Sequence, residues 1–442
     1  MHSLTETTLN CNKSVKISFT GGDLSSDAGL LLVQDFASQI GFTKVIGQMF
    51  HTTDPALFRL HTDAANLMQA IYQIIASYGE DDCADELTNE PVFKTILGKE
   101  ALASQPTLSR FYNRMDEATL SQFTAIARKM RDIIYSICPP EYILFDIDST
   151  LLDTYGQQEG EAFNYHYQSH GYHPLLCYDG LTGDLLKAEL RDGTKYCSNG
   201  AAEFMQPLLK EYRERFPEML VALRGDSGFA SPDLYDVCEK YNCKYTIRLK
   251  INKTLTALAA ETDDSLYRAT RFNQVDYAVV YGEFMYQAGT WDCPRRVVYK
   301  IEKPSNQLTH MYTFVVTNME DLAPYQVLQL YCGRGKMENF IKEGKGGFDF
   351  GAVSSRSRVV NANRLQVHVL AYNLFNWLRR LVLPKSMRKL RVDTIRVKLM
   401  KVAARVVHAS RYIHFRLCSS CPYKAQFYET LSNIGKLNPQ LE

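Results

Sequence analysis

The chain has 442 residues, of which 45% are hydrophobic and 22% charged, a composition typical of globular proteins. Its length exceeds one ordinary core, so we expect about two to four domains. No run is long and apolar enough to span a bilayer, the N-terminus lacks an apolar signal core, and the 11 cysteines show no framework spacing. These features exclude a membrane protein and a disulfide-stapled secreted domain, and they favour a reducing cytoplasm.

The formal net charge of +1 conceals a strongly basic C-terminal region. Residues 1–150 carry 11 Lys/Arg against 19 Asp/Glu, and residues 151–350 carry 22 against 27. Residues 351–442 carry 17 Lys/Arg against 3 Asp/Glu, a net charge of +14. Such a region is expected to bind a polyanion, and nucleic acid is favoured over an anionic membrane because no long apolar face with Trp anchors accompanies the charge.

The first 140 residues are predicted to be mainly helical after a short strand near Val15–Phe19. Apolar residues recur at helical spacing in Leu30–Phe36 and Leu67–Ser77. The acidic run Glu80–Glu86 is interpreted as a solvated loop.

Ser104–Arg114 predicts a helix that Ser104 caps and that carries Arg110 and Arg114 one turn apart. Its short length and two arginines are compatible with a DNA recognition helix. A surface helix in a helical bundle is the alternative interpretation, and both remain open from the sequence.

From Glu141 onwards the pattern indicates an α/β fold. Tyr142–Phe145 is a short apolar run that predicts a buried strand. Further strands are predicted at Leu175–Tyr178, Leu185–Leu190, Leu220–Leu223 and Lys244–Leu249, with helices at Ala201–Phe216 and Pro232–Lys240. A hairpin followed by alternating helices and strands describes a mixed sheet flanked by helices.

The second half of the chain is predicted to begin with a β insertion. Period-two alternation indicates antiparallel strands at Val275–Tyr286, Arg295–Ile301 and Met311–Val316. Helices are expected at Leu322–Lys342 and Leu365–Leu383, and the basic tail is expected to be helical to about its end. The resulting division is 1–140 (helical, DNA-binding), 141–250 (first part of the core), 251–319 (β insertion), 320–385 (core completed by a helix) and 386–442 (basic, helical).

Within that long helix, one stretch groups charged residues on a single face. At 100° per residue, the shared face holds Tyr331, Arg334, Glu338 and Lys342, an aromatic ring and a carboxylate among cations. An ordinary amphipathic helix with a salt-bridged face explains the same spacing. Leu330, Met337 and Ile341 form the opposite, buried stripe.

Three glycines lie within or near the end of this predicted helix, although glycine disfavours a helix. Gly333 and Gly335 each weaken a helix by about 1 kcal/mol relative to Ala, which is understandable if another backbone or a DNA strand passes close by. Gly344 is expected to end the helix before Lys345.

Four acidic residues are candidates for chemistry. Asp146 and Asp148 are two apart, so they point to the same side at the end of a predicted strand. Asp226 follows another short apolar strand, and Glu338 lies on the helix. Carboxylates at strand ends suit divalent metals, and two such metals stabilise the attacking and leaving oxygens in phosphoryl transfer. Taken singly, each Asp is more often a turn or cap residue.

Together these motifs resemble the DDE transposases of bacterial insertion sequences. The matching segments are DIDST at 146–150, GDSGF at 225–229, the Tyr-x2-Arg-x3-Glu-x6-Lys signature at Tyr331, Arg334, Glu338 and Lys345, and QEGEAFNYHYQSHGYHPLL at Gln158–Leu176. The last segment resembles insertion-sequence family thirteen-eighty. The likeness extends from about Leu60 to Leu383.

The resemblance implies a ribonuclease-H-like core with the β insertion between the second Asp and the Glu. It makes Asp148, Asp226 and Glu338 the catalytic, metal-binding triad, with two Mg²⁺ ions (or Mn²⁺). Asp148 is preferred to Asp146 because family members place Ser/Gly-Thr directly after the catalytic Asp. It further implies cut-and-paste transposition by metal-dependent cleavage at transposon ends and strand transfer, with double-stranded DNA (transposon ends and target) as partner. We expect a dimer in the DNA complex, no membrane association, and a location in the bacterial cytoplasm at the nucleoid.

DNA contacts are expected beyond the triad. The set comprises Tyr331, Arg334, Lys342 and Lys345 of the signature, Trp291 of the insertion, Arg110 and Arg114, and the tail cations Arg379, Arg380, Arg388, Lys389 and Arg391. The resemblance implies that Trp291 receives a flipped base; the alternative is that it packs the core of the insertion.

Two other function classes are compatible with parts of the sequence. FDIDSTLL resembles the nucleophile motif of haloacid-dehalogenase-like phosphatases, with Asp146 as nucleophile and Asp148 as acid–base, but Ala230 stands where their later motif needs Asp. The second alternative is a non-enzymatic DNA-binding regulator, which Ser104–Arg114 and the basic tail support. Such a protein needs no aligned carboxylates, so metal-dependent cleavage would separate it from a transposase.

Two possible zinc sites are disfavoured. His166, His170 and His173 are better explained by bonds to backbone or DNA, and Cys418 with Cys421 is half a zinc site without a second pair.

Overall fold

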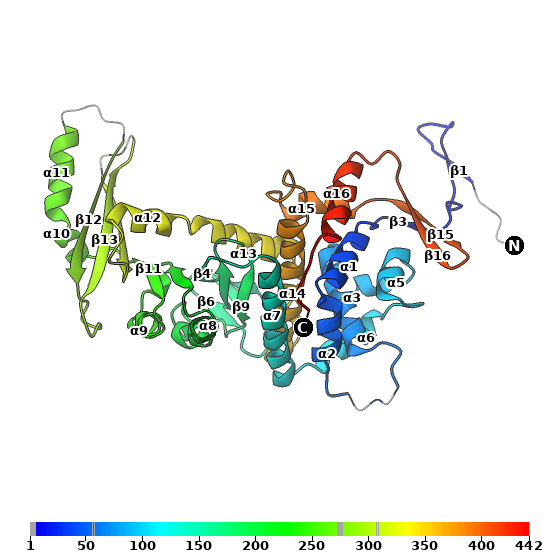
Figure 1. Cartoon of the computed structure of the whole chain (residues 1–442), viewed down its shortest axis with the longest axis horizontal. Coiled ribbons are helices and arrows are strands. Elements are labelled where there is room, and N and C mark those ends of the chain that lie inside the picture. The colour runs from blue at the N-terminus through cyan, green and yellow to red at the C-terminus, as the bar shows by residue number, and fades with distance from the viewer. Residues whose placement is uncertain are drawn as a thin grey trace. The chain divides into compact units, whose positions relative to one another are not determined.

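The computed structural model describes residues 6–54, 56, 58–271, 277–305, 307 and 309–441. The chain forms two compact units, each built from separate segments (Figure 1). The terminal unit comprises Met1–Cys138, Lys345–Ala352 and Gln366–Glu442, and the central unit comprises Pro139–Gly344 and Val353–Leu365. Among the described helices, none combines the length and the hydropathy needed to cross a bilayer.

The central unit is organised around one mixed, eight-stranded sheet with the order β12-β13-β14-β11-β10-β4-β8-β9. Strand β10 is parallel to β4 and β11, and the other neighbouring pairs are antiparallel. The strands are β4 (Tyr142–Ser149), β8 (Leu175–Asp179), β9 (Leu185–Glu189), β10 (Leu220–Gly225), β11 (Lys244–Leu249), β12 (Ala278–Tyr286), β13 (Arg295–Lys303) and β14 (Met311–Thr317). The expected mixed α/β sheet is confirmed.

Helices and a smaller sheet complete this unit. The helices are α8 (Ala201–Arg215), the 3₁₀ helix η1 (Ser227–Phe229), α9 (Pro232–Lys240), α10 (Lys253–Leu258), α11 (Ala260–Arg271) and α12 (Pro324–Cys332). Helices α13 (Gly335–Gly347) and α14 (Arg358–Leu381) contain residues of both units. The small sheet has the order β5-β7-β6, with β5 (Leu152–Asp153), β6 (Ala162–Asn164) and β7 (Ser169–Tyr172).

In its described residues, the segment expected as a β insertion contains three antiparallel strands and two helices. Strands β12, β13 and β14 extend the main sheet, because β14 pairs with β11. Helices α10 and α11 were not predicted; α11 has the sequence AETDDSLYRATR, whose polar residues and alanines suit a helix with one shallow apolar side. Val275 and Asp276, at the expected start of the first strand, lie outside the described residues.

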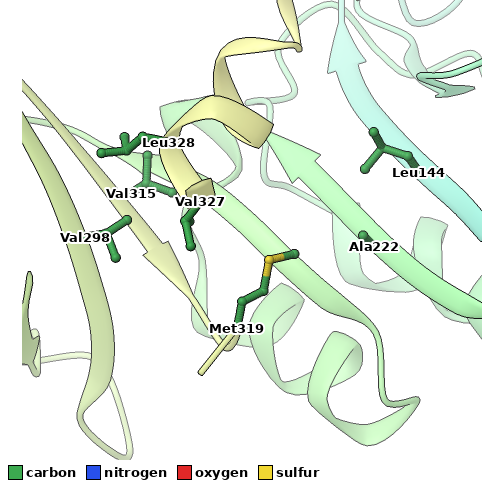
Figure 2. Close-up of a cluster of buried hydrophobic side chains, with 7 residues drawn as sticks. All are labelled: Leu144, Ala222, Val298, Val315, Met319, Val327 and Leu328. Atoms are coloured by element: carbon green, nitrogen blue, oxygen red, sulfur yellow. The ribbon is translucent and has the colours of Figure 1, made fainter. Parts of the chain in front are cut away.

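A buried cluster holds α12 against one face of the sheet (Figure 2). Val327 and Leu328 of α12 belong to the same cluster as Val298 and Val315 on neighbouring strands. The cluster also includes Leu144, Ala222 and Met319. Residue 144 lies on the same side of β4 as residues 146 and 148, since strand side chains alternate. Helix α12 therefore packs on the face that carries the two aspartates.

The prediction of one helix over 322–342 is wrong, because the helix breaks at Gly333 and Arg334. The Leu330 carbonyl accepts a hydrogen bond from Arg224 Nη1 at 2.7 Å instead of continuing the helical ladder. A Cβ on Gly333 would lie 2.7 Å from the same Nη1, so any larger residue would have to displace the guanidinium. Helix α13 then continues through Gly344 to Gly347, past the expected end. The close approach expected at Gly333 is thus made by an arginine side chain.

The terminal unit is mainly helical in its N-terminal part, as expected. Its elements there are β1 (Thr7–Thr8), β2 (Lys16–Ile17), β3 (Leu24–Ser25), α1 (Leu30–Gln39), α2 (Phe42–Met49), α3 (Asp63–Ile75), α4 (Cys83–Glu86), α5 (Pro91–Leu97), α6 (Gln105–Asn113) and α7 (Glu117–Ile137). The acidic run ends in the short helix α4. Ser104 stands at the N-cap of α6, as expected. Its hydroxyl forms a hydrogen bond with Thr107 Oγ1 at 3.1 Å and does not cap a backbone N–H of the helix.

The expectation of a helical basic tail is wrong in part. The tail contains α15 (Val392–Ile395), a π-helical turn (Arg396–Met400), the hairpin β15 (Ala404–Ala409) and β16 (Tyr412–Leu417), and α16 (Lys424–Ile434). Both strands are rich in β-branched and aromatic residues, which favour a strand. Their two-residue turn holds Ser410 at φ 55°, and β15 also pairs with β3.

Candidate active site

The register of the sheet places two acidic residues side by side. Asp146 on β4 pairs with Arg224 on the parallel strand β10. Two residues further along each strand are Asp148 and Asp226, and Asp226 follows directly after the end of β10. Because neighbouring strands lie about 4.8 Å apart, this register brings the two carboxylates to adjacent positions at the carboxyl ends of parallel strands.

Asp146 is engaged in a buried ion pair and does not reach solvent. The residue is 0% exposed, and its Oδ1 and Oδ2 accept hydrogen bonds from Arg224 Nε and Nη2, each at 2.6 Å. Burial raises the pKa of the Asp146 carboxyl, and the guanidinium opposes that rise. A Cβ on Gly180 would lie 2.4 Å from Asp146 Oδ2, so a glycine is required beside the pair. The phosphatase alternative requires Asp146 as its nucleophile, and in this ion pair Asp146 is unavailable for that role.

Asp148, by contrast, lines an open cavity. Its Oδ2 accepts a hydrogen bond from Arg334 Nη2 at 2.8 Å, and its Oδ1 accepts one from the Ser149 N–H at 2.9 Å. Burial raises its pKa to about 6, the negative charges of Asp226 and Glu338 add to the rise, and Arg334 opposes it. Asp148 thus lies within electrostatic range of both other acidic residues of the expected triad.

Asp226 lines the same cavity and is held by the turn that follows β10. Its Oδ1 accepts a hydrogen bond from the Gly228 N–H at 2.7 Å, so the carboxylate caps the 3₁₀ helix η1. The local sequence explains the geometry, since aspartate favours such caps and glycine permits the tight turn. Asp226 acts as a cap and as a wall of the cavity at once.

Glu338 occupies the first turn of α13 and is exposed. Its side chain is 65% exposed, and its Oε2 lies 3.9 Å from Lys342 Nζ, one turn along the helix. Phe340 of the same helix packs against the Tyr178 ring, with ring centroids 5.7 Å apart. In the described part of the chain, no three His, Cys, Asp or Glu side chains lie at metal-binding spacing. Of the three expected metal ligands, Asp148 and Asp226 line one cavity, whereas Glu338 does not line it.

The cavity above the two aspartates has a volume of about 440 Å³. Its walls come from two segments, Phe163–Tyr167, which begins in β6, and Gly193–Cys197, and from Lys250. Ser149 Oγ lies 3.2 Å from Cys197 Sγ at the base of the cavity, and burial raises the pKa of that thiol. The sequence analysis singled out His166 of these residues as a possible zinc ligand and did not predict a cavity wall, because the two segments become neighbours only through the fold.

Arg224 was also missed, although a signal for it exists. It sits at an inward position of a buried apolar strand, where an arginine requires a partner of opposite charge. The partner itself, Asp146, is given only by the register of β10 with β4.

The candidate histidine and cysteine sites do not assemble. His166 and His173 line the cavity, whereas His170 is exposed and bonds Glu161 Oε2 at 2.9 Å. His173 Nδ1 donates to the Lys195 carbonyl at 2.6 Å. Neither these histidines nor Cys418 and Cys421 form a group of three metal-binding side chains among the described residues.

Trp291 lies at the edge of a second, neighbouring cavity. It is 7% exposed, and its ring meets those of Tyr235 and Tyr286 edge to face at 5.5 and 5.4 Å. The second cavity has a volume of about 310 Å³ and shares Lys250 and Ser227 with the first. The tryptophan therefore packs among aromatic rings and also borders a space next to the aspartates.

The remaining signature residues lie near or beyond this region. Tyr331 is half-buried and packs on the cluster of α12, and burial raises its pKa. Lys342 is exposed on α13. Lys345 belongs to the terminal unit.

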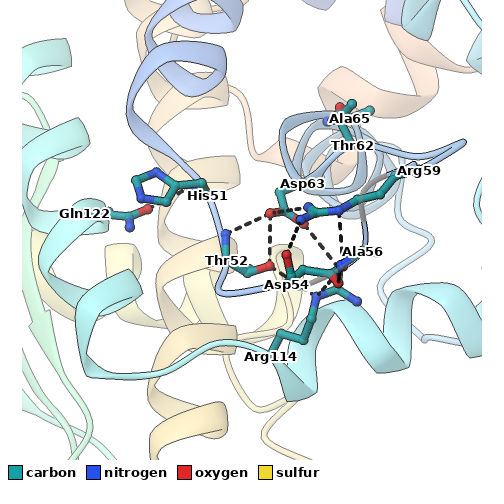
Figure 3. Close-up of polar contacts among 10 residues, drawn as sticks. All are labelled: His51, Thr52, Asp54, Ala56, Arg59, Thr62, Asp63, Ala65, Arg114 and Gln122. Atoms are coloured by element: carbon teal, nitrogen blue, oxygen red, sulfur yellow. Dashed lines mark hydrogen bonds and ion pairs between the residues drawn. The ribbon is translucent and has the colours of Figure 1, made fainter.

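In the terminal unit, Arg114 is bound inside a polar network (Figure 3). Its Nη2 lies 3.2 Å from Asp63 Oδ1, its Nε donates to Thr52 Oγ1 at 3.1 Å, and its Nε lies 3.4 Å from Asp54 Oδ2. Arg110, on the same helix, is exposed. The two arginines expected on one recognition helix thus have different surroundings.

The tail cations differ in the same way. Arg388, Lys389 and Arg391 are exposed, and the side chain of Arg391 is 86% exposed. Arg379 and Arg380 are half-buried, and Arg379 Nη2 donates to Asn376 Oδ1 at 2.7 Å.

Neighbouring acidic strand ends that border one cavity define a carboxylate site on a mixed α/β sheet. The family model described as Transposase DDE domain group 1 matches residues 7–439, and the chain belongs to this family. Membership implies a nuclease and strand-transfer enzyme of DNA transposition. Among solved structures, the chain is similar to one titled "Cryo-EM structure of piggyBac transposase synaptic complex with hairpin DNA (SNHP)", with 14% identity and a TM-score of 0.45 over 85% of this chain and 79% of that chain. No curated protein matched.

Proposed function

We propose that this chain is a cut-and-paste DNA transposase that acts through Asp148, Asp226 and Glu338. The proposal rests on one observation: Asp148 and Asp226 line the same cavity. Asp146, by contrast, is held in the ion pair with Arg224. The strand order β9-β8-β4-β10-β11, with three antiparallel strands followed by two parallel ones, supports the ribonuclease-H-like core that the sequence motifs imply.

The donor set fits a divalent ion such as Mg²⁺ or Mn²⁺. Carboxylate oxygens are the ligands these ions prefer, and Asp148 and Asp226 would hold the ion, with Glu338 as third ligand. When bound, divalent ions activate water and stabilise the attacking and leaving oxygens of phosphoryl transfer. The raised pKa of Asp148 reflects burial beside like charges, and this is an environment that a cation relieves.

The protein's own side chains have separable tasks in this proposal. Arg334 orients Asp148 through the 2.8 Å contact and presents its remaining N–H groups to a phosphate. Gly228 N–H orients Asp226. Tyr331, Lys342 and Lys345 would contact the DNA backbone, and Trp291 would receive a flipped base from the strand being processed.

The setting of the reaction is also proposed. We infer a bacterial insertion-sequence enzyme of family thirteen-eighty that works on chromosomal DNA in the cytoplasm. Its partners would be the transposon ends and the target duplex, and a dimer would hold the two ends together. Exposed cations of the tail would supply affinity that does not depend on DNA sequence.

One experiment tests the proposal directly. DNA that carries the ends of the element is incubated with the full chain, with and without Mg²⁺, and strand breaks are mapped on a denaturing gel. Breaks at the element's end that require Mg²⁺ support the proposal. Sequence-specific binding without cleavage in any divalent metal would favour a regulator instead.

A further inference from the structure

The cavity above Asp148 and Asp226 has an aromatic wall that triad chemistry does not use. Phe163, Tyr165, His166 and Tyr167 all line it, within five consecutive residues. Tyr165 is 83% exposed, and its ring meets the Phe163 ring edge to face at 5.3 Å. A ring that lines the cavity and is this exposed is accessible to a ligand that enters.

The wall is held in place by buried hydrogen bonds. Asn164, which is 7% exposed, donates from Nδ2 to the Gly193 carbonyl at 2.9 Å and accepts the His166 N–H at 3.0 Å. A Cβ on Gly193 would lie 2.1 Å from the Gly171 carbonyl oxygen, so glycine alone lets the two segments approach. The Phe163–Tyr167 segment is therefore fixed before any ligand arrives.

The opposite loop is fixed by a second buried residue. Arg191, which is 6% exposed, donates to the carbonyls of His173 at 3.0 Å and Tyr196 at 3.2 Å. His173 Nδ1 in turn donates to the Lys195 carbonyl at 2.6 Å. Arg191 and His173 thus hold the second wall, and the bond from Asn164 to the Gly193 carbonyl links it to the first, which makes the cavity a preformed site.

The charges around the cavity suit a polyanion whose backbone passes near the aspartates. Lys195 and Lys250 line it and are exposed, and Lys250 Nζ donates to Tyr196 Oη at 3.0 Å. The volume of about 440 Å³ falls in the range of about 300–1,000 Å³ usual for small-molecule sites. Aromatic faces, cations and carboxylates in one preformed cavity match the base, the phosphate and the reacting phosphodiester of a nucleotide.

We propose that this cavity binds one unstacked nucleotide of the DNA strand whose phosphodiester lies at Asp148 and Asp226, with its base stacked on Tyr165. The inference rests on the proposed function. It concerns a site separate from Trp291, which borders the second cavity. Bases stack on any aromatic face, so the site would be tolerant of sequence.

The test compares Tyr165→Ala with Tyr165→Phe on a labelled DNA end in Mg²⁺. Loss of the ring is expected to slow cleavage about 5- to 150-fold, as for one lost base–aromatic stack, while Tyr165→Phe keeps the wild-type rate. Tyr155→Ala is the matched control, since Tyr155 is 98% exposed, lies in the same part of the chain and does not line the cavity. Melting temperatures show whether each variant folds.

A second measurement separates base binding from a structural role. Abasic nucleotides are placed one at a time on either side of the cleavage site. At the position whose base enters the cavity, the abasic site is expected to bring the Tyr165→Ala and wild-type rates together, because no base remains to stack.

Three outcomes are distinguishable. No Mg²⁺-dependent cleavage by the wild type overturns the proposed function itself. Wild-type cleavage with equal rates for Tyr165→Ala and Tyr155→Ala overturns the inference alone. A slow Tyr165→Ala whose deficit persists at every abasic position also overturns it, since the ring would then act on something other than a base.

Discussion

Arg334 Nη2 lies 2.8 Å from Asp148 Oδ2, although 186 positions separate the two residues in the chain. The contact depends on the break between α12 and α13, which removes Arg334 from a regular helix. It depends equally on the cluster that fixes α12 to the sheet. The cation opposes the rise in the pKa of Asp148 that burial causes.

The triad assignment predicts a separation of cleavage from binding. Asp148→Ala, Asp226→Ala and Glu338→Ala are each expected to abolish strand cleavage while DNA affinity stays largely intact, because metal ligands are lost but phosphate contacts remain. Cleavage and gel-shift assays on the same DNA end measure both. Asp233→Ala, an exposed acidic residue on α9, is the control. Full activity in Glu338→Ala would remove Glu338 from the triad.

The Asp146–Arg224 pair predicts a stability effect. Arg224→Met leaves an uncompensated buried carboxylate and is expected to cost about 3–5 kcal/mol, whereas Asp146→Leu with Arg224→Met recovers most of that loss. Urea unfolding of the single and double variants measures it. A single variant within about 1 kcal/mol of the wild type would show that water reaches the pair.

The exposed tail cations predict a change in salt dependence. Changing Arg388, Lys389 and Arg391 to Gln is expected to reduce the log–log slope of DNA affinity against salt by roughly 0.9 per lost phosphate contact. Arg379→Gln serves as comparison, since that side chain is half-buried and bonded to Asn376. An unchanged slope in the triple variant would exclude these residues from phosphate binding.

Trp291 predicts an effect on one step of the reaction. Base capture by Trp291 means that Trp291→Ala slows second-strand processing while first-strand nicking persists. Both steps are timed on one labelled DNA end. The ring is also packed between Tyr235 and Tyr286, so Trp291→Phe is made in parallel to preserve packing. Equal loss in both steps, with a lowered melting temperature, would assign Trp291 to the core.

The network around Asp63 predicts that Arg114 and Arg110 differ. Arg114→Ala is expected to destabilise the protein by about 1–3 kcal/mol, because a buried carboxylate loses a charged donor, while Arg110→Ala leaves stability unchanged. Bonds from Thr52, Arg114 and Arg59 lower the pKa of Asp63 against the opposing effect of burial.

The sign of the pH dependence follows from that lowered pKa. The folded pKa of Asp63 lies below its unfolded value, so the stabilisation is present above about pH 4 and is lost as pH falls through the folded pKa. The melting temperature of the wild type should therefore fall more steeply in acid than that of Asp63→Asn. Parallel acid profiles would contradict this assignment.

Much of the central unit follows from local sequence patterns. A buried run such as Leu220–Leu223 predicts a strand because its length and apolar character suit a sheet covered on both faces. The two-residue spacing of Asp146 and Asp148 places them on one face whatever the tertiary structure, because strand side chains alternate. The motifs around Asp226 and Glu338 could likewise be identified from the sequence.

The tertiary structure decided which of these residues is free to act. Asp146 and Asp148 point to the same face of β4, so the strand pattern does not distinguish them. Only the register with β10 gives Asp146 a buried arginine partner and places Asp148 at the cavity. The same arginine ends α12, which no helical periodicity can indicate, because the competing hydrogen bond comes from a residue 106 positions away. Local sequence determines which face a side chain takes, but its partners across the sheet depend on long-range pairing that no local pattern records.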